Sequence, residues 1–132
     1  MKNKNSENKN SKIKKIEQAI IFCAGKSTRT WPLTITKPKP LLKIANKEIL
    51  SYNIDTIKEF VNEILIVIGY HKEQIIDFVN ANYINEKNSN LKNQKLNIKF
   101  IEQKELNGTG SALLSVKDHL KDRFIVMNGD DI

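Results

Sequence analysis

Several residues that could bind a phosphate group follow a short apolar run near the start of the chain. Residues 19–24 read Ala-Ile-Ile-Phe-Cys-Ala, and Gly25 ends the run. A glycine at this place lets backbone N–H groups face an anion, and Thr28 adds a hydroxyl donor. Arg29 and Lys39 add two positive charges to the same loop. Because a guanidinium holds phosphate oxygens in pairs, these residue types predict a site for a phosphate-bearing ligand.

The composition of this loop, residues 25–40, favours a functional role. It contains all three prolines of the chain, which stiffen the backbone and lower the entropy lost when a ligand orders it. Arg29 is one of only two arginines among 22 basic residues, which indicates a geometric need for a guanidinium. We expect Lys26 to face solvent and Trp31 to anchor the loop by packing on the core.

The elements that must position this loop alternate between apolar runs and amphipathic stretches. Three runs have the length of strands buried on both faces, and they cover residues 19–24, 64–68 and 124–127, while residues 98–101 are expected to form a shorter strand. The stretches have apolar residues at helical spacing, and they cover residues 49–60, 72–84 and 109–120. This alternation predicts an α/β, Rossmann-like fold with a largely parallel sheet and flanking helices. Ligands of such sheets bind beyond the carboxyl ends of the strands, so we expect loops 25–40, 103–109 and 128–131 to meet there.

Length and charge exclude several classes of protein. The 132 residues suit one domain. The sequence contains no run of about 18 apolar residues, which a membrane-spanning helix would need. The net charge is +7, but residues 1–15 hold six lysines and one glutamate, which leaves +2 for the rest. We interpret residues 1–16 as a disordered basic leader rather than a signal peptide or a nucleic-acid site. The single cysteine is typical of a reducing compartment, which predicts a cytoplasmic protein.

Three blocks of the sequence resemble the sugar-phosphate nucleotidylyltransferases, also called nucleotide-sugar pyrophosphorylases, of the thymidylyltransferase and UDP-sugar pyrophosphorylase types. The blocks are Cys-Ala-Gly-Lys-Ser-Thr-Arg-Thr-Trp-Pro-Leu-Thr-Ile-Thr-Lys-Pro-Lys-Pro-Leu-Leu from Cys23 to Leu42, then Glu102-Gln103 with Gly108-Thr109 and Ala112, then Asn128-Gly-Asp130. The resemblance runs from about residue 17 to the end of the chain. It implies that residues 17–132 form the N-terminal part of a truncated catalytic domain.

The resemblance also implies what the matching residues do. The loop would bind a nucleoside triphosphate through Ala24, Gly25, Lys26, Ser27 and Thr28. Arg29 and Lys39 would be catalytic, because they would hold the phosphates while a sugar 1-phosphate attacks the α-phosphorus.

The second and third blocks would bind the base and a metal ion. Gln103, Gly108 and Thr109 would face the base, and the glutamine amide favours UTP or dTTP. Asp130 would hold magnesium, which needs few carboxylates when phosphate oxygens complete its shell. A missing C-terminal part would supply the second metal ligand, the sugar site and any homo-oligomer contacts. We therefore expect weak nucleotide binding without turnover from these 132 residues.

Other functions stay open. Cytidylyl transfer to phosphocholine uses a similar opening motif, and a non-catalytic nucleotide-sensing module could also retain it. A P-loop ATPase fits less well, because Ile20 stands where its first glycine would be. Ser27 replaces the second glycine of the family motif. If the backbone there has a positive φ, serine costs about 1 kcal/mol more than glycine.

Overall fold

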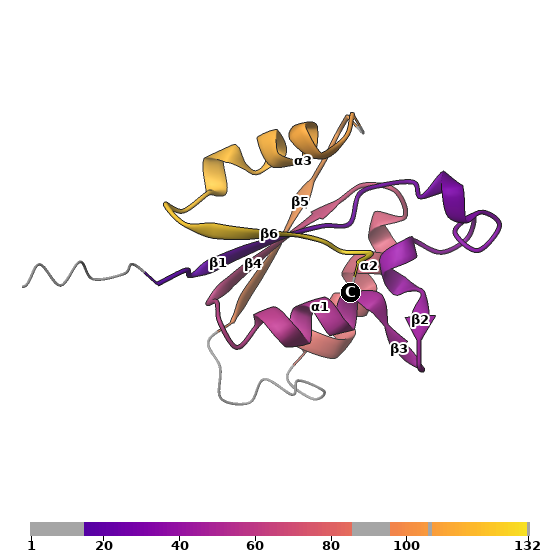
Figure 1. Ribbon diagram of the computed structural model, residues 1–132, viewed down its shortest axis with the longest axis horizontal. Coiled ribbons are helices and arrows are strands. Elements are labelled where there is room, and N and C mark those ends of the chain that lie inside the picture. Colours follow the sequence, from indigo (N-terminus) through magenta and orange to yellow (C-terminus); the bar gives the residue numbers. More distant parts are fainter. Residues whose placement is uncertain (1–14, 86–95, 106, 132) are drawn as a thin grey trace, which may run out of the picture.

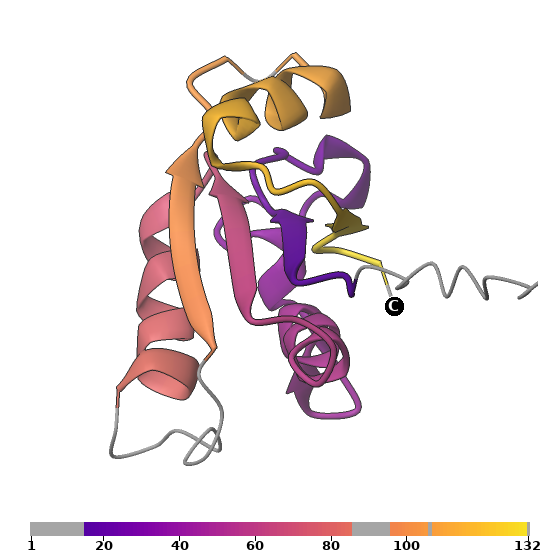
Figure 2. The ribbon, with the colours of Figure 1, turned by 90° about the vertical axis from the view of Figure 1, so that its left-hand side faces the viewer.

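The computed structural model describes residues 15–85, 96–105 and 107–131, so nearly all of the basic leader lies outside the described residues. Four parallel strands form one sheet in the order β5-β4-β1-β6 (Figure 1). The strands are β1 (Gln18–Phe22), β4 (Glu63–Ile68), β5 (Asn97–Glu102) and β6 (Phe124–Asn128). Figure 2 shows the arrows of β5 and β4 pointing the same way. The predicted α/β fold with a parallel sheet is confirmed.

Helices cover both faces of the sheet. In Figure 1, α3 (Thr109–Ser115) lies on one side, and α1 (Ile49–Ile57) and α2 (Lys72–Val79) lie on the other. Side chains alternate along β1 and β4, so Ile21 and Ile66 belong to the core under α1 and α2, whereas Ile20 and Leu65 pack with α3. A strand buried on both faces must be apolar throughout, which explains the continuous runs in the sequence. Among the described residues, no helix is both long and apolar enough to cross a bilayer.

Several elements end differently from the prediction. The helix expected over residues 49–60 ends at Ile57. The stretch 72–84 divides into α2 and a π-helix, η3 (Asn80–Ile84). The helix expected over 109–120 ends at Ser115, and a 3-10 turn, η4 (Lys117–His119), follows. The prediction of a fully buried strand at 124–127 was wrong, because Val126 of β6 is 44% exposed at the edge of the described sheet.

The long loop after β1 is less irregular than the sequence indicated. It contains two 3-10 turns, η1 (Thr28–Thr30) and η2 (Lys39–Leu41), and it leads into a hairpin of β2 (Lys43–Ile44) and β3 (Lys47–Glu48). Ala45 and Asn46 both have positive φ, as a two-residue hairpin turn of the right twist requires. Trp31 is 55% exposed, so the prediction that it packs on the core was wrong.

A buried glutamine joins three segments at the amino-terminal end of the sheet. Gln18 is fully buried, and its Nε2 donates to Glu63 Oε1 at 2.6 Å and to the carbonyl of His119 at 2.8 Å. Its Oε1 accepts from the backbone N–H of Lys121 at 2.9 Å. Every polar atom of this buried amide therefore has a partner, and β1 is tied to β4 and to the segment that enters β6.

Candidate functional site

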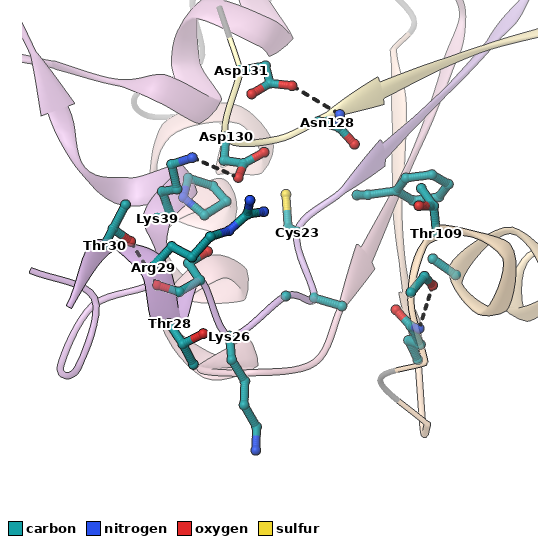
Figure 3. Close-up of a pocket in the computed structure, with 18 residues that line it drawn as sticks. Cys23, Lys26, Thr28, Arg29, Thr30, Lys39, Thr109, Asn128, Asp130 and Asp131 are labelled. Carbon is teal, nitrogen blue, oxygen red and sulfur yellow. Dashed lines mark hydrogen bonds and ion pairs between the residues drawn. The ribbon is translucent and has the colours of Figure 1, made fainter.

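A cavity of about 890 Å³ lies at the carboxyl ends of β1 and β6, within the usual size of small-molecule sites (Figure 3). The loop after β1, the start of η2, the turn before α3 and the residues after β6 form its wall. All the residues predicted for the site line it, namely Ala24, Gly25, Lys26, Ser27, Thr28, Arg29, Lys39, Gln103, Gly108, Thr109 and Asp130. The structure thus brings the three blocks together, and the role of each residue stays a prediction.

Charged groups from two distant parts of the chain meet in this cavity. Lys39 Nζ lies 3.1 Å from Asp130 Oδ2 and donates a hydrogen bond to it. Figure 3 shows the guanidinium of Arg29 directed into the cavity towards Asp130, whereas Lys26 extends away from them. Asp131 is exposed, and its Oδ2 accepts from Asn128 Nδ2 at 3.0 Å. Two cations and one carboxylate therefore share a small volume that could hold a phosphate and its counter-ion.

The loop that carries Arg29 has a strained backbone at Ser27. Ser27 has φ 53° and ψ 45°, in the left-handed region. Its carbonyl accepts from the N–H and the hydroxyl of Thr30, at 3.1 and 2.8 Å, and from the hydroxyl of the fully buried Thr34 at 2.8 Å. These bonds hold the turn in the conformation that glycine would adopt without strain, so the expected cost of serine applies here.

Gly25 has a different reason to be a glycine. Its φ is ordinary, and a Cβ added there would meet nothing within 4 Å. The fold itself would therefore accept a side chain at this position. The open space lies on the wall of the cavity, where a ligand could approach the backbone closely.

Gln103 lies in the cavity wall, but its amide nitrogen is already engaged. The residue is buried, and Nε2 donates to the carbonyls of Glu105 at 2.8 Å and Gly108 at 3.4 Å. Gly108 has φ 92°, which favours glycine, and it immediately precedes α3. In this structure Gln103 holds the turn before α3. Pairing of its amide nitrogen with a base would require exchange of these carbonyl partners.

Several close contacts at the end of β6 were not found from the sequence. The N–H of Gly129 donates to the carbonyl of Phe22 at 2.8 Å, and a Cβ on Gly129 would overlap Cys23 Sγ. Burial, and then the nearby charge of Asp130, raise the pKa of the Cys23 thiol, so the thiol stays protonated.

A further contact at the end of β6 comes from α1, where buried Asn53 donates to the carbonyl of Asn128 at 3.3 Å. A polar residue on the apolar face of a helix was the available signal for this contact.

The metal-binding side chains of this site fit magnesium rather than a metal that is enclosed by protein ligands. Within the part of the chain that the structure describes, no three or more His, Cys, Asp or Glu side chains form a metal-binding group. Magnesium often takes one or two carboxylates and completes its shell with phosphate oxygens and water. The carboxylate of Asp130, in a cavity wall that also holds Arg29 and Lys39, suits that arrangement.

Comparison with known proteins decides the family. Residues 18–132 match the family model described as nucleotidyl transferase. The chain belongs to the nucleotidyl transferase family. Its resemblance to that family, inferred from three blocks of sequence, is confirmed.

Two curated relatives show how much of a nucleotidyl transferase the chain represents. It is 43% identical over 114 residues to the bifunctional protein GlmU of Methanocaldococcus jannaschii, covering 86% of the chain and 25% of that protein. It is 34% identical over 116 residues to the UTP–glucose-1-phosphate uridylyltransferase AglF of Haloferax volcanii, covering 87% of the chain and 44% of that protein. The chain therefore spans less than half the length of these relatives.

Solved nucleotidyl transferase structures share the fold. UDP-glucose pyrophosphorylase complexed with UDP-glucose superposes with a TM-score of 0.70 at 27% identity, covering 87% of the chain and 46% of that structure. CTP:phosphocholine cytidylyltransferase from Streptococcus pneumoniae superposes with a TM-score of 0.66 at 31% identity, with the same coverage. The likeness extends over nearly all of the chain and about half of each neighbour.

Proposed function

We propose that this chain forms the nucleotide-binding part of an enzyme that transfers a nucleotidyl group from a nucleoside triphosphate to a sugar 1-phosphate. The products are an NDP-sugar and pyrophosphate. The contact between Lys39 and Asp130 carries the proposal, because it places a cation and a carboxylate from two separate blocks on the wall of one cavity. Such a pair suits a triphosphate that arrives with a divalent cation.

The proposed reaction is an in-line displacement at the α-phosphorus. A phosphate oxygen of the sugar 1-phosphate forms the new bond, and the bond to the bridging oxygen of the β-phosphate breaks, so pyrophosphate leaves. Arg29 and Lys39 would bind the phosphate oxygens and stabilise the charge that develops on them. Asp130 would hold magnesium, which when bound neutralises charge on the triphosphate. The chain would contribute positioning and electrostatics rather than a covalent intermediate.

UTP or dTTP is the proposed nucleotide. The support is Gln103 in the cavity wall and the uridylyltransferase named among the relatives. A second candidate is cytidylyl transfer to phosphocholine, because a cytidylyltransferase for that acceptor shares the fold at 31% identity.

Calorimetric titration of the 132-residue chain with UTP, dTTP, CTP, GTP and ATP tests the nucleotide, in the presence and absence of magnesium. We expect UTP or dTTP to bind most tightly and only with magnesium. Tightest binding of CTP would favour the phosphocholine reaction instead. Absence of binding by every triphosphate would contradict the proposal. Hydrolysis of ATP without any sugar phosphate would indicate a P-loop ATPase.

Pyrophosphate exchange separates an enzyme from a nucleotide-sensing module. We expect none from the 132 residues alone, because the sugar site and a second metal ligand are expected elsewhere. In a protein that carries a whole nucleotidyl transferase domain with this chain as its N-terminal part, Asp130→Asn should abolish exchange. A sensing module would show no exchange in either form. The cytoplasmic location, the division into residues 1–16 and 17–132 and assembly through a C-terminal part remain proposals.

A further inference from the structure

Three side chains at the start of α2 bind the loop that carries the cations. Tyr70 Oη donates to the carbonyl of Ile35 at 3.1 Å, and His71 Nε2 lies 2.9 Å from the same carbonyl oxygen. Gln74 Nε2 donates to the carbonyl of Thr36 at 2.8 Å. None of the three side chains lines the cavity, and none belongs to the hydrophobic clusters. We call Tyr70, His71 and Gln74 the loop clamp.

Two of the three clamp side chains bind the same carbonyl group, that of Ile35. A carbonyl oxygen can only accept, so the contact with His71 is a hydrogen bond when Nε2 carries the hydrogen. Tyr70 and His71 then use both lone pairs of the Ile35 carbonyl, and their rings pack with centroids 4.0 Å apart. His71 also has φ 53°, a left-handed conformation that is uncommon for a residue other than glycine. Such strain persists where surrounding contacts hold it, and it often accompanies function.

Tyr70 joins the two ends of the loop. Its backbone N–H donates to the carbonyl of Ala24 at 3.1 Å, where the loop begins, and its hydroxyl binds Ile35 near the far end. Thr34, one residue before Ile35, bonds inward to the carbonyl of Ser27. Residues 34–36 are therefore held from the inner side by Ser27 and from the outer side by the clamp.

A short and stiff backbone segment links Thr36 to Lys39, so holding Thr36 also restricts Lys39. Only Lys37 and Pro38 intervene, and proline fixes its own φ. The N–H of Leu41 donates to the carbonyl of Pro38 at 2.9 Å, and the N–H of Leu42 donates to that of Lys39 at 3.0 Å, which closes η2. Lys39 thus has little backbone freedom once Thr36 is held.

We propose that Tyr70, His71 and Gln74 are positioning residues that keep Lys39 beside Asp130 for the triphosphate. This inference rests on the proposed function, and it assigns the clamp to the phosphate side of the site only. Gln103, Gly108 and Thr109 belong to a different segment, whereas the hydrogen bonds of the clamp side chains go to Ile35 and Thr36. The clamp should therefore affect a nucleotide through its phosphates and leave recognition of the nucleoside unchanged.

The first test compares binding of UTP with binding of uridine, which has no phosphate. In the 132-residue chain, Tyr70→Phe with Gln74→Ala should raise the Kd of UTP with magnesium by roughly three- to tenfold, the effect of one or two weakened hydrogen bonds. The uridine Kd, measured by NMR titration, should not change. His71→Gln should retain wild-type affinity for UTP, because its amide nitrogen reaches about as far as Nε2. Equal losses for UTP and uridine would overturn the proposal in favour of general destabilisation.

A matched control removes the same kinds of bond elsewhere. Tyr52 Oη donates to the carbonyl of Ile44 at 2.9 Å, and Asn82 Nδ2 donates to that of Phe78 at 2.8 Å. Tyr52→Phe with Asn82→Ala should change neither Kd. In a Lys39→Met background the clamp substitutions should have no further effect on UTP, because the residue through which they act is absent. Full additivity with Lys39→Met would overturn the proposal.

A second measurement needs no nucleotide. Hydrogen exchange at the amides of Leu41 and Leu42 should become faster in the Tyr70→Phe, Gln74→Ala variant than in the wild type and in the Tyr52→Phe, Asn82→Ala control. If the wild type binds no triphosphate but exchange responds as expected, the proposed function fails while the clamp stands. If hydrogen exchange at these two amides is unchanged in the clamp variant, the clamp does not position Lys39, whether or not the chain binds a nucleotide.

Discussion

Lys39 and Asp130, separated by 91 residues of sequence, form an ion pair of 3.1 Å on the wall of the cavity. About a third of each side chain is exposed, so water screens the pair and limits its contribution to stability. The pair holds the two blocks in contact before any ligand arrives. A triphosphate with magnesium would give each partner a new counter-charge, the phosphate for Lys39 and the cation for Asp130.

Lys39→Met should therefore separate binding from folding. We expect a change of less than about 1 kcal/mol in the free energy of unfolding. Binding of UTP with magnesium should fall by at least about tenfold, because a charge-assisted bond to phosphate is lost. Urea denaturation and calorimetry measure the two effects. Lys43→Met, which removes the pair between exposed Lys43 and partly buried Glu48, is the control and should leave binding intact. Wild-type affinity in Lys39→Met would contradict the assignment.

Ser27→Gly should stabilise the chain. Glycine adopts the left-handed conformation of residue 27 without steric strain, so the free energy of unfolding should rise by about 1 kcal/mol. The urea midpoint measures the change. Lys26→Gly, at a neighbouring position without positive φ, should give no such gain. A loss of stability in Ser27→Gly would mean that the serine side chain stabilises the turn in another way.

Alanine substitutions at Gly25 and Gly129 should differ in their effect on the stability of the fold. A Cβ on Gly129 would collide with Cys23 and lie 2.9 Å from the carbonyl of Phe22, so Gly129→Ala should destabilise by about 1–3 kcal/mol. Gly25→Ala has open space and should leave the thermal midpoint nearly unchanged. It should nevertheless weaken UTP binding if the triphosphate approaches the backbone there. Full UTP affinity in Gly25→Ala would show that the ligand stays away from this position.

Acid should weaken the fold partly through Glu63. Burial alone would raise the pKa of Glu63, but hydrogen bonds from Gln18 and Lys99 outweigh it and lower the pKa below the ordinary value of 4.5. A pKa that is lower in the folded state favours the fold above about pH 4.5, and this contribution is lost as pH falls through the folded value.

The Glu63→Gln variant tests this contribution. Its free energy of unfolding should be lower than that of the wild type at about pH 7, and the difference should shrink towards about pH 3. Denaturation in urea at several pH values measures it. Asp77→Asn, at an exposed position of α2, serves as the control. A difference that stays constant with pH would refute the role of this carboxylate.

The parts of the fold that could be predicted are those with a continuous or periodic pattern. The runs around Ile20 and Leu65 identify strands buried on both faces, because only such strands are apolar at every position. The rule that parallel strands present their carboxyl ends at one edge then places Arg29, Gln103 and Asp130 near one another. The structure brings all three to one cavity.

The parts that could not be predicted depend on contacts between distant segments. The spacing of Ala112, Val116 and Leu120 fits a continuous helix, yet Val116 has φ −104° and ψ 1° and α3 ends before it. The short turns η1 and η2 leave no periodic signal, since each has three residues. Tyr70 binds a carbonyl 35 residues earlier in the sequence, and no local pattern reveals such a bond.

The amide of Gln18 contributes to the register of β6 against β1. It binds the backbone of His119 and Lys121 just before β6, where Gln18 pairs with Phe124, and the same register pairs Phe22 with Asn128 at the far end. Because strand pairing allows only whole-residue steps, an error at that far end would carry Asp130 out of reach of Lys39. A design that grafts these loops onto another parallel sheet would therefore also need contacts that fix the strand register, as the hydrogen bonds of Gln18 do here.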